Sequence, residues 1–398
     1  MEQIVEELGQ LTARQQPEWS DADQVRRVRK ALAGRPPLVQ KEDVLTLRSH
    51  LSRVATGEAL LVQSGDCAED PAECSRGDVW RKSAVLDHLA AELKMIVHRP
   101  VLRVGRIAGQ FAKPRSKPVE RVGDSDLPAY RGHMVNGPEP DPESRRPDPL
   151  RILTGYMAAC EVMEQLGWPR MYDRRPDPLV EPSVWTSHEA LLLDYEIPML
   201  REDDRGARWL SSTHWPWVGE RTRQVDGAHV ALLARVVNPV ACKVGPAMGV
   251  DELLRLCEKL DPQREPGRLT FIARMGADLV ADRLPRLVES VRAAGHPVIW
   301  LTDPMHANTI TGPDGTKIRL VETIIREVRS FRQAVANAGG VAGGLHLETT
   351  PHDVAECRTE EPCHDVEEGP ASGAVSLCDP RLSLPQARSV VAAWNYQP

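Results

Sequence analysis

Residues 238–306 decide the fold. In this stretch NPVACKVGP (238–246), GRLTFIARMG (267–276) and HPVIWLTDPMH (296–306) alternate with the helical sequences DELLRLCEKL (251–260) and LVADRLPRLVESVRAAG (279–295). Each apolar run has the length of one strand, and each helical sequence is long enough to return the chain across a sheet. Strands that alternate with such helices are typical of βα units and a parallel sheet.

The same pattern extends in both directions. Further strand candidates are ALLVQSGDCAED (59–70), VLRVGRIAGQFAKPRS (101–116), GGLHLETT (343–350) and VSLCDP (375–380), with weaker ones near SVWTSHE (183–189) and WPWVGE (215–220). About eight strands over roughly 340 residues favour an α/β fold, a (β/α)₈ barrel with inserted loops. A doubly wound sheet is the competitor, but no GxGxxG or GxxxxGK[ST] motif is present. We expect a short helical extension at 1–55 and the barrel at 56–398.

Composition sets the limits on function. The 398 residues include 50 Lys+Arg and 57 Asp+Glu, which gives a formal charge of −7. This balance gives no reason to expect nucleic acid or an anionic membrane as a partner. The eight cysteines are scattered without a CxxC pair, and the N-terminal sequence lacks the apolar run of a secretory signal. We therefore expect reduced thiols and a cytoplasmic protein.

Metal-competent side chains follow several strand candidates directly. In a barrel these strand ends meet at one face, where active sites form. A mixed sulfur, nitrogen and oxygen set suits a divalent transition ion. Any one of these residues alone would more often be a buried polar group, so the prediction depends on the joint pattern. The expected metal ligands are Cys67, His306, Glu348 and Asp379.

Cationic side chains form a second group near the same strand ends. Guanidinium groups match phosphate and carboxylate oxygens in a bidentate way, so the group indicates an anionic substrate with one or two phosphates. Salt bridges to the protein's own carboxylates are the alternative, notably for Arg221, which follows Glu220. The group consists of Arg106, Lys113, Arg115, Arg221, Lys243 and Arg274.

The motifs together resemble those of class II DAHP (3-deoxy-D-arabino-heptulosonate 7-phosphate) synthases, over about residues 18–395. The short forms of phenazine and other secondary-metabolite pathways are the most similar. The resemblance rests on GDCAE (65–69), RIAGQFAKPRS (106–116), YRGHMVNG (130–137), TSHEALLLDYE (186–196), GERTRQVDGAHVAL (219–232), NPVACKVGP (238–246), RMG (274–276), DPMHANT (303–309), GGLHLETT (343–350), AEC (355–357) and CDPRL (378–382).

The resemblance implies a transferase of the shikimate pathway. It would condense phosphoenolpyruvate with erythrose 4-phosphate and water, release phosphate, and feed chorismate and aromatic amino acid biosynthesis or secondary metabolism. The cofactor implied is a divalent ion, first Mn²⁺, with Co²⁺, Fe²⁺, Zn²⁺ or Cd²⁺ as alternatives. It would be held by the four ligands above, with His306 and Lys113 taking part in catalysis. Either Lys113 or a water on the metal would supply the alkoxide proton.

Substrate contacts carry over by motif in the same way. Phosphoenolpyruvate would be bound by Arg106, Lys113, the backbone of Glu220, Arg221, Lys243 and Arg274. The phosphate of erythrose 4-phosphate would be bound by Arg115 and Ser116.

Other functions remain open from the sequence. One is an amino-DAHP synthase that uses an amino or imino analogue of erythrose 4-phosphate. Another is a non-catalytic subunit that binds a partner enzyme. The resemblance also implies a homo-oligomer, a dimer or tetramer, and leaves room for a chorismate mutase partner.

Overall fold

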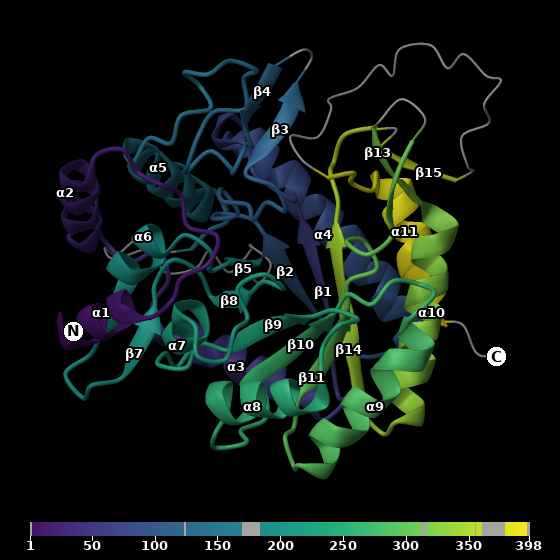
Figure 1. The fold of residues 1–398 in the computed structure, drawn as a ribbon. Coiled ribbons are helices and arrows are strands. Elements are labelled where there is room, and N and C mark those ends of the chain that lie inside the picture. The colour runs from purple at the N-terminus through teal and green to yellow at the C-terminus, as the bar shows by residue number, and fades with distance from the viewer. Residues whose placement is uncertain are drawn as a thin grey trace, which may run out of the picture. The chain divides into compact units, whose positions relative to one another are not determined.

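The predicted barrel is present. The computed structural model describes residues 2–122, 125–168, 184–312, 316–354, 356–359 and 379–395. Eight strands close into a barrel in the order β1-β14-β11-β10-β9-β8-β5-β2 (Figure 1). They are β1 (Leu60–Gly65), β2 (Val101–Arg106), β5 (Trp185–Glu189), β8 (Trp215–Val218), β9 (Val240–Val244), β10 (Leu269–Ala273), β11 (Ile299–Thr302) and β14 (Val341–Glu348).

Both weak strand candidates are confirmed as β5 and β8, which pair in parallel. The pairs β1–β14, β10–β11 and β11–β14 are parallel as well. The expected strand at 375–380 lies outside the described residues except for Asp379 and Pro380.

Burial explains why these runs form strands. Every residue of β9, β10 and β11 is buried. A parallel strand covered on both faces needs a continuous apolar run rather than an alternating one. The helices between them are instead apolar on one side. In α8 the buried residues are Leu253, Leu256, Cys257 and Leu260, a spacing that places them on one helical face.

One glycine is required where β14 meets β1. Gly344 has φ of 146°, in the range that residues with a Cβ rarely adopt. A Cβ at this position would overlap the carbonyl oxygen of Leu61, its partner in the ladder. The two backbones can therefore approach closely only because glycine has no side chain.

The remaining elements precede the barrel, lie between its strands or follow its last strand, β14. The longer helices are α1 (Glu2–Gln10), α2 (Ala22–Ala33), α3 (Lys41–Ala55), α4 (Arg76–Val97), α5 (Leu150–Gln165), α8 (Val250–Leu260), α9 (Val280–Ala293), α10 (Val321–Asn337) and α11 (Leu384–Ala392). The short helices are α6 (Leu193–Glu196) and α7 (Ala228–Leu233), with 3₁₀ turns η1 (Pro71–Glu73), η2 (Ile197–Met199) and η3 (Ala393–Asn395). The small strands are β3 (Val119–Val122), β4 (Ser125–Pro128), β6 (Leu200–Glu202), β7 (Arg208–Leu210), β12 (Thr309–Thr311), β13 (Lys317–Leu320) and β15 (Cys357–Arg358).

The chain forms two compact units. The first comprises residues 1–47, 68–80 and 106–240, and the second comprises residues 48–67, 81–105 and 241–398. In the second unit α9 packs against α8 and α10. The division into 1–55 and 56–398 stays a prediction. In the part of the chain that is described, no helix is both long and apolar enough to cross a membrane.

Candidate active site

Three of the predicted metal ligands meet in the second unit. One donor atom each from Cys67, His306 and Asp379 lies within 4.8 Å of the other two. Cys67 follows β1, and His306 lies in the loop after β11. The thiol of Cys67 donates to Oδ2 of Asp379 at 3.5 Å. Residues more than 300 positions apart are thus brought together, as the strand-end pattern predicts.

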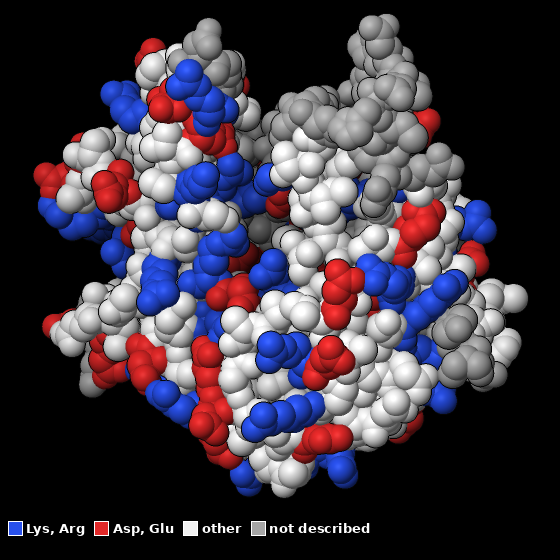
Figure 2. All heavy atoms as spheres, turned by 45° about the vertical axis from the view of Figure 1, so that its right-hand side comes forward, with Lys and Arg blue, Asp and Glu red and all other residues white. Residues whose placement is uncertain are grey.

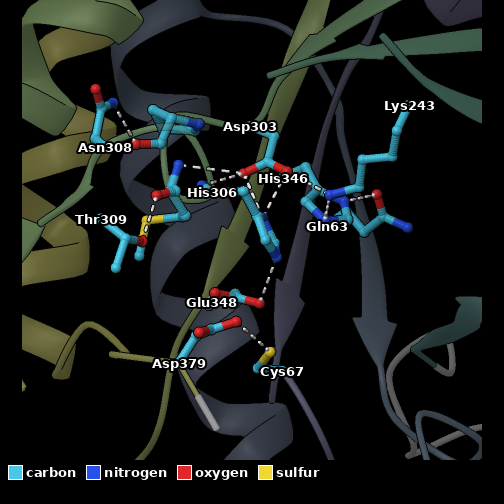
Figure 3. Close-up of polar contacts among 12 residues, drawn as sticks. Gln63, Cys67, Lys243, Asp303, His306, Asn308, Thr309, His346, Glu348 and Asp379 are labelled. Carbon is cyan, nitrogen blue, oxygen red and sulfur yellow. Dashed lines mark hydrogen bonds and ion pairs between the residues drawn. The ribbon is translucent and has the colours of Figure 1, made fainter. Parts of the chain in front are cut away.

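Glu348 places a fourth donor beside this group. It ends β14 and is fully buried, and its Oε1 lies 3.1 Å from Nε2 of His306. Figure 3 shows the carboxylates of Glu348 and Asp379 stacked between His306 and Cys67. We call these four residues the metal cluster.

His306 is oriented by a carboxylate on its other side. Oδ2 of Asp303 lies 2.8 Å from Nδ1 of His306, so Nε2 is the nitrogen turned toward the metal cluster (Figure 3). Burial disfavours the charged imidazolium, but the carboxylates of Asp303 and Glu348 outweigh it and raise the pKa of His306 to about 9. Negative charges that attract a proton to this site also attract a metal cation.

The donor set fits a divalent transition ion. One thiol, one imidazole nitrogen and two carboxylates provide the mixed ligands such ions take. A carboxylate on the distal nitrogen of a ligating histidine is the usual support for a metal-bound imidazole. Two cations contact the carboxylates: Arg319 donates to Oε2 of Glu348 at 2.6 Å, and Lys317 lies 2.7 Å from Oδ1 of Asp379.

Lys243 connects to the metal cluster through Asp303. Its Nζ is paired with Oδ2 of Asp303 and lies 2.9 Å from Nε2 of His346. Nδ1 of His346 lies 2.6 Å from Oε1 of Gln63. Although burial favours the neutral acid, His306 and Lys243 hold the pKa of Asp303 well below its usual value. Lys243 on β9 thus lies one carboxylate away from a predicted metal ligand.

Arg274 is the other predicted cation of this unit. It directly follows β10, is half-buried, and donates its backbone N–H to the carbonyl of Val244 at 2.9 Å.

The rest of the cationic group lies in the first unit. Nη2 of Arg221 donates to Oγ of Ser116 at 2.5 Å, which joins two residues predicted to bind different substrates. The guanidinium of Arg106 lies 5.6 Å from the ring centroid of Trp217, in a cation–π contact. On the face drawn in Figure 2, Lys and Arg are interspersed with Asp and Glu.

The salt-bridge alternative holds for Arg115 and Lys243 but not for Arg221. Glu220 pairs with Arg223, where Nη2 lies 2.9 Å from Oε1, rather than with its neighbour Arg221. Arg115 is paired with Glu120, and Glu120 is also paired with Arg145. A phosphate bound at Arg115 would therefore either share its guanidinium with the carboxylate of Glu120 or displace that carboxylate.

The sequence analysis missed residues that hold these side chains in place. Glu69 accepts the backbone N–H groups of Ala108, Gly109 and Gln110 at 3.0, 2.8 and 2.7 Å. It thereby anchors the loop that leads from β2 to Lys113. Asp303 was equally overlooked, although it stands three residues before His306 in a motif that was noted.

A family profile identifies the protein family of this chain. The profile described as the class-II DAHP synthetase family matches residues 4–168 and 170–393. The chain belongs to the class-II DAHP synthetase family. It is therefore an enzyme that condenses phosphoenolpyruvate with erythrose 4-phosphate, and the resemblance seen in the sequence is confirmed.

Curated relatives support the family assignment across the whole chain. A Pseudomonas fluorescens protein named "Probable phospho-2-dehydro-3-deoxyheptonate aldolase" is 53% identical over 403 residues, covering 100% of this chain and 98% of the relative. A phospho-2-dehydro-3-deoxyheptonate aldolase of Streptomyces coelicolor is 38% identical, covering 95% and 93%. One from Mycolicibacterium smegmatis is 36% identical, covering 94% and 90%.

A solved structure supports the fold. The phospho-2-dehydro-3-deoxyheptonate aldolase of Francisella tularensis matches with a TM-score of 0.55 at 14% identity, over 92% of this chain and 96% of that one. At this identity the likeness concerns the fold alone.

Proposed function

We propose that the metal cluster binds one divalent ion, Mn²⁺ in the first place, with Co²⁺, Fe²⁺, Zn²⁺ or Cd²⁺ as alternatives. The observation that carries this is the convergence of Cys67, His306 and Asp379 within 4.8 Å, with Glu348 beside His306. When bound, the ion supplies a Lewis acid that polarises an aldehyde oxygen. Asp303 fixes the ring of His306, and Arg319 fixes the carboxylate of Glu348.

The cationic group binds the phosphates and the carboxylate of the substrates. Phosphoenolpyruvate is bound by Arg106, Lys113, the backbone of Glu220, Arg221, Lys243 and Arg274. The phosphate of erythrose 4-phosphate is bound by Arg115 and Ser116. The hydrogen bond between Arg221 and Ser116 supports adjacent binding of the two substrates. Fixed cations of this kind also offset the charge that develops during the reaction.

In the reaction, the methylene carbon of phosphoenolpyruvate bonds to the aldehyde carbon, and the aldehyde oxygen becomes an alkoxide. Lys113, 8% exposed, or a water at the metal cluster donates a proton to that alkoxide. Bond formation leaves a positive charge on the phosphoenolpyruvate carbon that carries the phosphate. Water adds to this carbon and loses a proton. The C–O bond to phosphate then breaks as the new hydroxyl gives up its proton, which releases inorganic phosphate and leaves the keto group of the product. The named relatives favour erythrose 4-phosphate over its amino analogue as the aldehyde.

The remaining assignments are proposals from the sequence and its resemblance to the family. We propose a cytoplasmic homo-oligomer, a dimer or tetramer, that feeds secondary metabolism. A chorismate mutase is a candidate partner.

A paired kinetic experiment tests the substrate roles. Arg106→Ala should raise the KM for phosphoenolpyruvate, and Arg115→Ala should raise the KM for erythrose 4-phosphate, each by at least about tenfold, because each removes a charge-assisted contact. Arg255→Ala, in α8, is a matched control that should change neither value. Equal effects of both variants on both substrates would contradict the division of roles.

A further inference from the structure

The segment that joins α1 to α2, residues 11–20, is hydrogen-bonded to other parts of the first unit at several points. We call it the N-terminal strap; it is the purple segment between these helices in Figure 1. The carbonyl of Thr12 accepts the N–H of Ala228 at 3.0 Å. Nε2 of Gln16 donates to the carbonyl of Leu191 at 2.9 Å. Nε1 of Trp19 donates to Oδ2 of Asp194 at 2.7 Å. The strap is therefore fixed in place on both sides of Gln15.

Gln15 is the strap residue that reaches the proposed substrate site. Its side-chain oxygen accepts the backbone N–H of Arg115 at 2.9 Å. Arg131 completes the arrangement, because its Nη1 donates to the carbonyls of Gln15 and Gln16, each at 3.2 Å. The carbonyl of Arg131 in turn accepts the N–H of Lys113 at 2.8 Å.

These bonds account for every backbone donor of the stretch Lys113-Pro114-Arg115. Proline has no N–H, so the stretch has two backbone donors, and one bonds to Arg131 while the other bonds to Gln15. A backbone held at both of its donors fixes where the side chains of Lys113 and Arg115 begin.

The backbone of Gln15 has an unusual conformation. Its φ is 63°, in the left-handed region that residues other than glycine adopt infrequently. Such a conformation persists where the surroundings hold it, and it is often found at functional sites. Here the two carbonyl contacts from Arg131 hold it while the side chain reaches Arg115.

We propose that Gln15 is a positioning residue for the substrate phosphate: it holds the backbone at Arg115 and thereby sets the affinity for erythrose 4-phosphate. The inference rests on the proposed roles of Arg115 and Ser116. Gln15 acts through the backbone, because the guanidinium of Arg115 is held separately by Glu120. The strap thus makes the N-terminal region part of substrate binding.

The test compares Gln15→Met with Gln10→Met. Methionine keeps the length of the side chain but replaces the amide oxygen with a thioether, which is at best a weak acceptor for the N–H of Arg115. Gln10 is an exposed residue at the end of α1. Gln15→Met should raise the KM for erythrose 4-phosphate by about three- to tenfold, the effect of losing one hydrogen bond. The kcat and the KM for phosphoenolpyruvate should change by less than about twofold. Gln10→Met should leave all three unchanged.

Hydrogen exchange gives a readout that does not depend on the assay. In Gln15→Met the amide of Arg115 should exchange faster than in the parent protein, because its acceptor is gone, while the midpoint of thermal unfolding stays within a few degrees. An unchanged KM for erythrose 4-phosphate, or a parallel rise in both KM values with a large fall in the midpoint, would overturn the inference.

Arg115→Ala separates this inference from the proposed function. If Arg115→Ala raises the KM for erythrose 4-phosphate and Gln15→Met does not, the role of Gln15 is wrong and the substrate assignment stands. If Arg115→Ala leaves that KM unchanged, the assignment of Arg115 is wrong and the inference about Gln15 falls with it.

Discussion

Asp303 binds His306 on the side of the imidazole that faces away from the metal cluster, with 2.8 Å between Oδ2 and Nδ1. The same carboxylate is paired with Lys243. One buried residue therefore orients a proposed metal ligand and holds a proposed substrate cation.

Replacing Asp303 should weaken metal binding. In Asp303→Asn the neutral amide supports the imidazole less well, and we expect the affinity for Mn²⁺ to fall by about 10- to 100-fold. Titration calorimetry on metal-stripped protein measures this directly. Asp282→Asn, an exposed position on α9, is the control. Unchanged affinity in Asp303→Asn would mean that Asp303 does not support the ligand.

Replacing Glu69 should loosen the loop after β2. The carboxylate accepts three backbone N–H groups, one of them from Ala108, whose φ is 69°. In Glu69→Gln one of the two oxygens becomes an NH₂ group, which cannot accept a backbone N–H and instead faces one. We therefore expect the free energy of unfolding to fall by about 2 kcal/mol. Urea denaturation measures it, with the exposed Glu161→Gln on α5 as the matched control. Equal stability of the two variants would refute this role.

His214 should make the protein less stable in acid. Complete burial lowers its pKa to about 3, below the unfolded value of about 6.5. The unfolded state therefore binds the proton first, and stability falls as the pH drops from about 6.5 toward 3, by at most about 1.4 kcal/mol per pH unit.

His214→Asn tests this origin, because its side-chain oxygen can replace Nδ1 as the acceptor for the N–H of Thr186. In urea unfolding between pH 7 and 4, the free energy of unfolding of the variant should fall less steeply with decreasing pH than that of the parent protein. His98→Asn, at an exposed histidine, should keep the slope. An identical slope in His214→Asn would show that other groups cause it.

Adding one methyl group at Gly344 should disrupt the barrel. In Gly344→Ala the positive φ and the overlap with the carbonyl of Leu61 act together. We therefore expect the free energy of unfolding to fall by at least about 3 kcal/mol. Gly249→Ala is the control, since a Cβ there meets nothing within 4 Å. A comparison of soluble yield and unfolding midpoint decides it, and two variants of equal stability would contradict the account.

The sequence predicted those features that depend on local pattern. Strands whose residues are all buried, such as β9, β10 and β11, were visible as short apolar runs, whereas β5 and β8 were only weak candidates. The proposed metal ligands stood out because each follows a strand candidate in the sequence. The strap was not predictable, since the bond from Arg115 to Gln15 joins residues 100 positions apart and nothing local marks Gln15. Asp303 was visible in its motif, but only the structure shows that it faces His306.

The central claim is that turnover needs one divalent ion held by the metal cluster. The most direct measurement is a titration of metal-stripped protein with Mn²⁺ that follows bound ion and release of phosphate from phosphoenolpyruvate and erythrose 4-phosphate together. We predict that activity rises in proportion to bound Mn²⁺ and levels off at one ion per chain, and that Cys67→Ser and Asp379→Ala lose both. Full activity in the stripped protein, or turnover that does not follow the bound ion, would contradict the account.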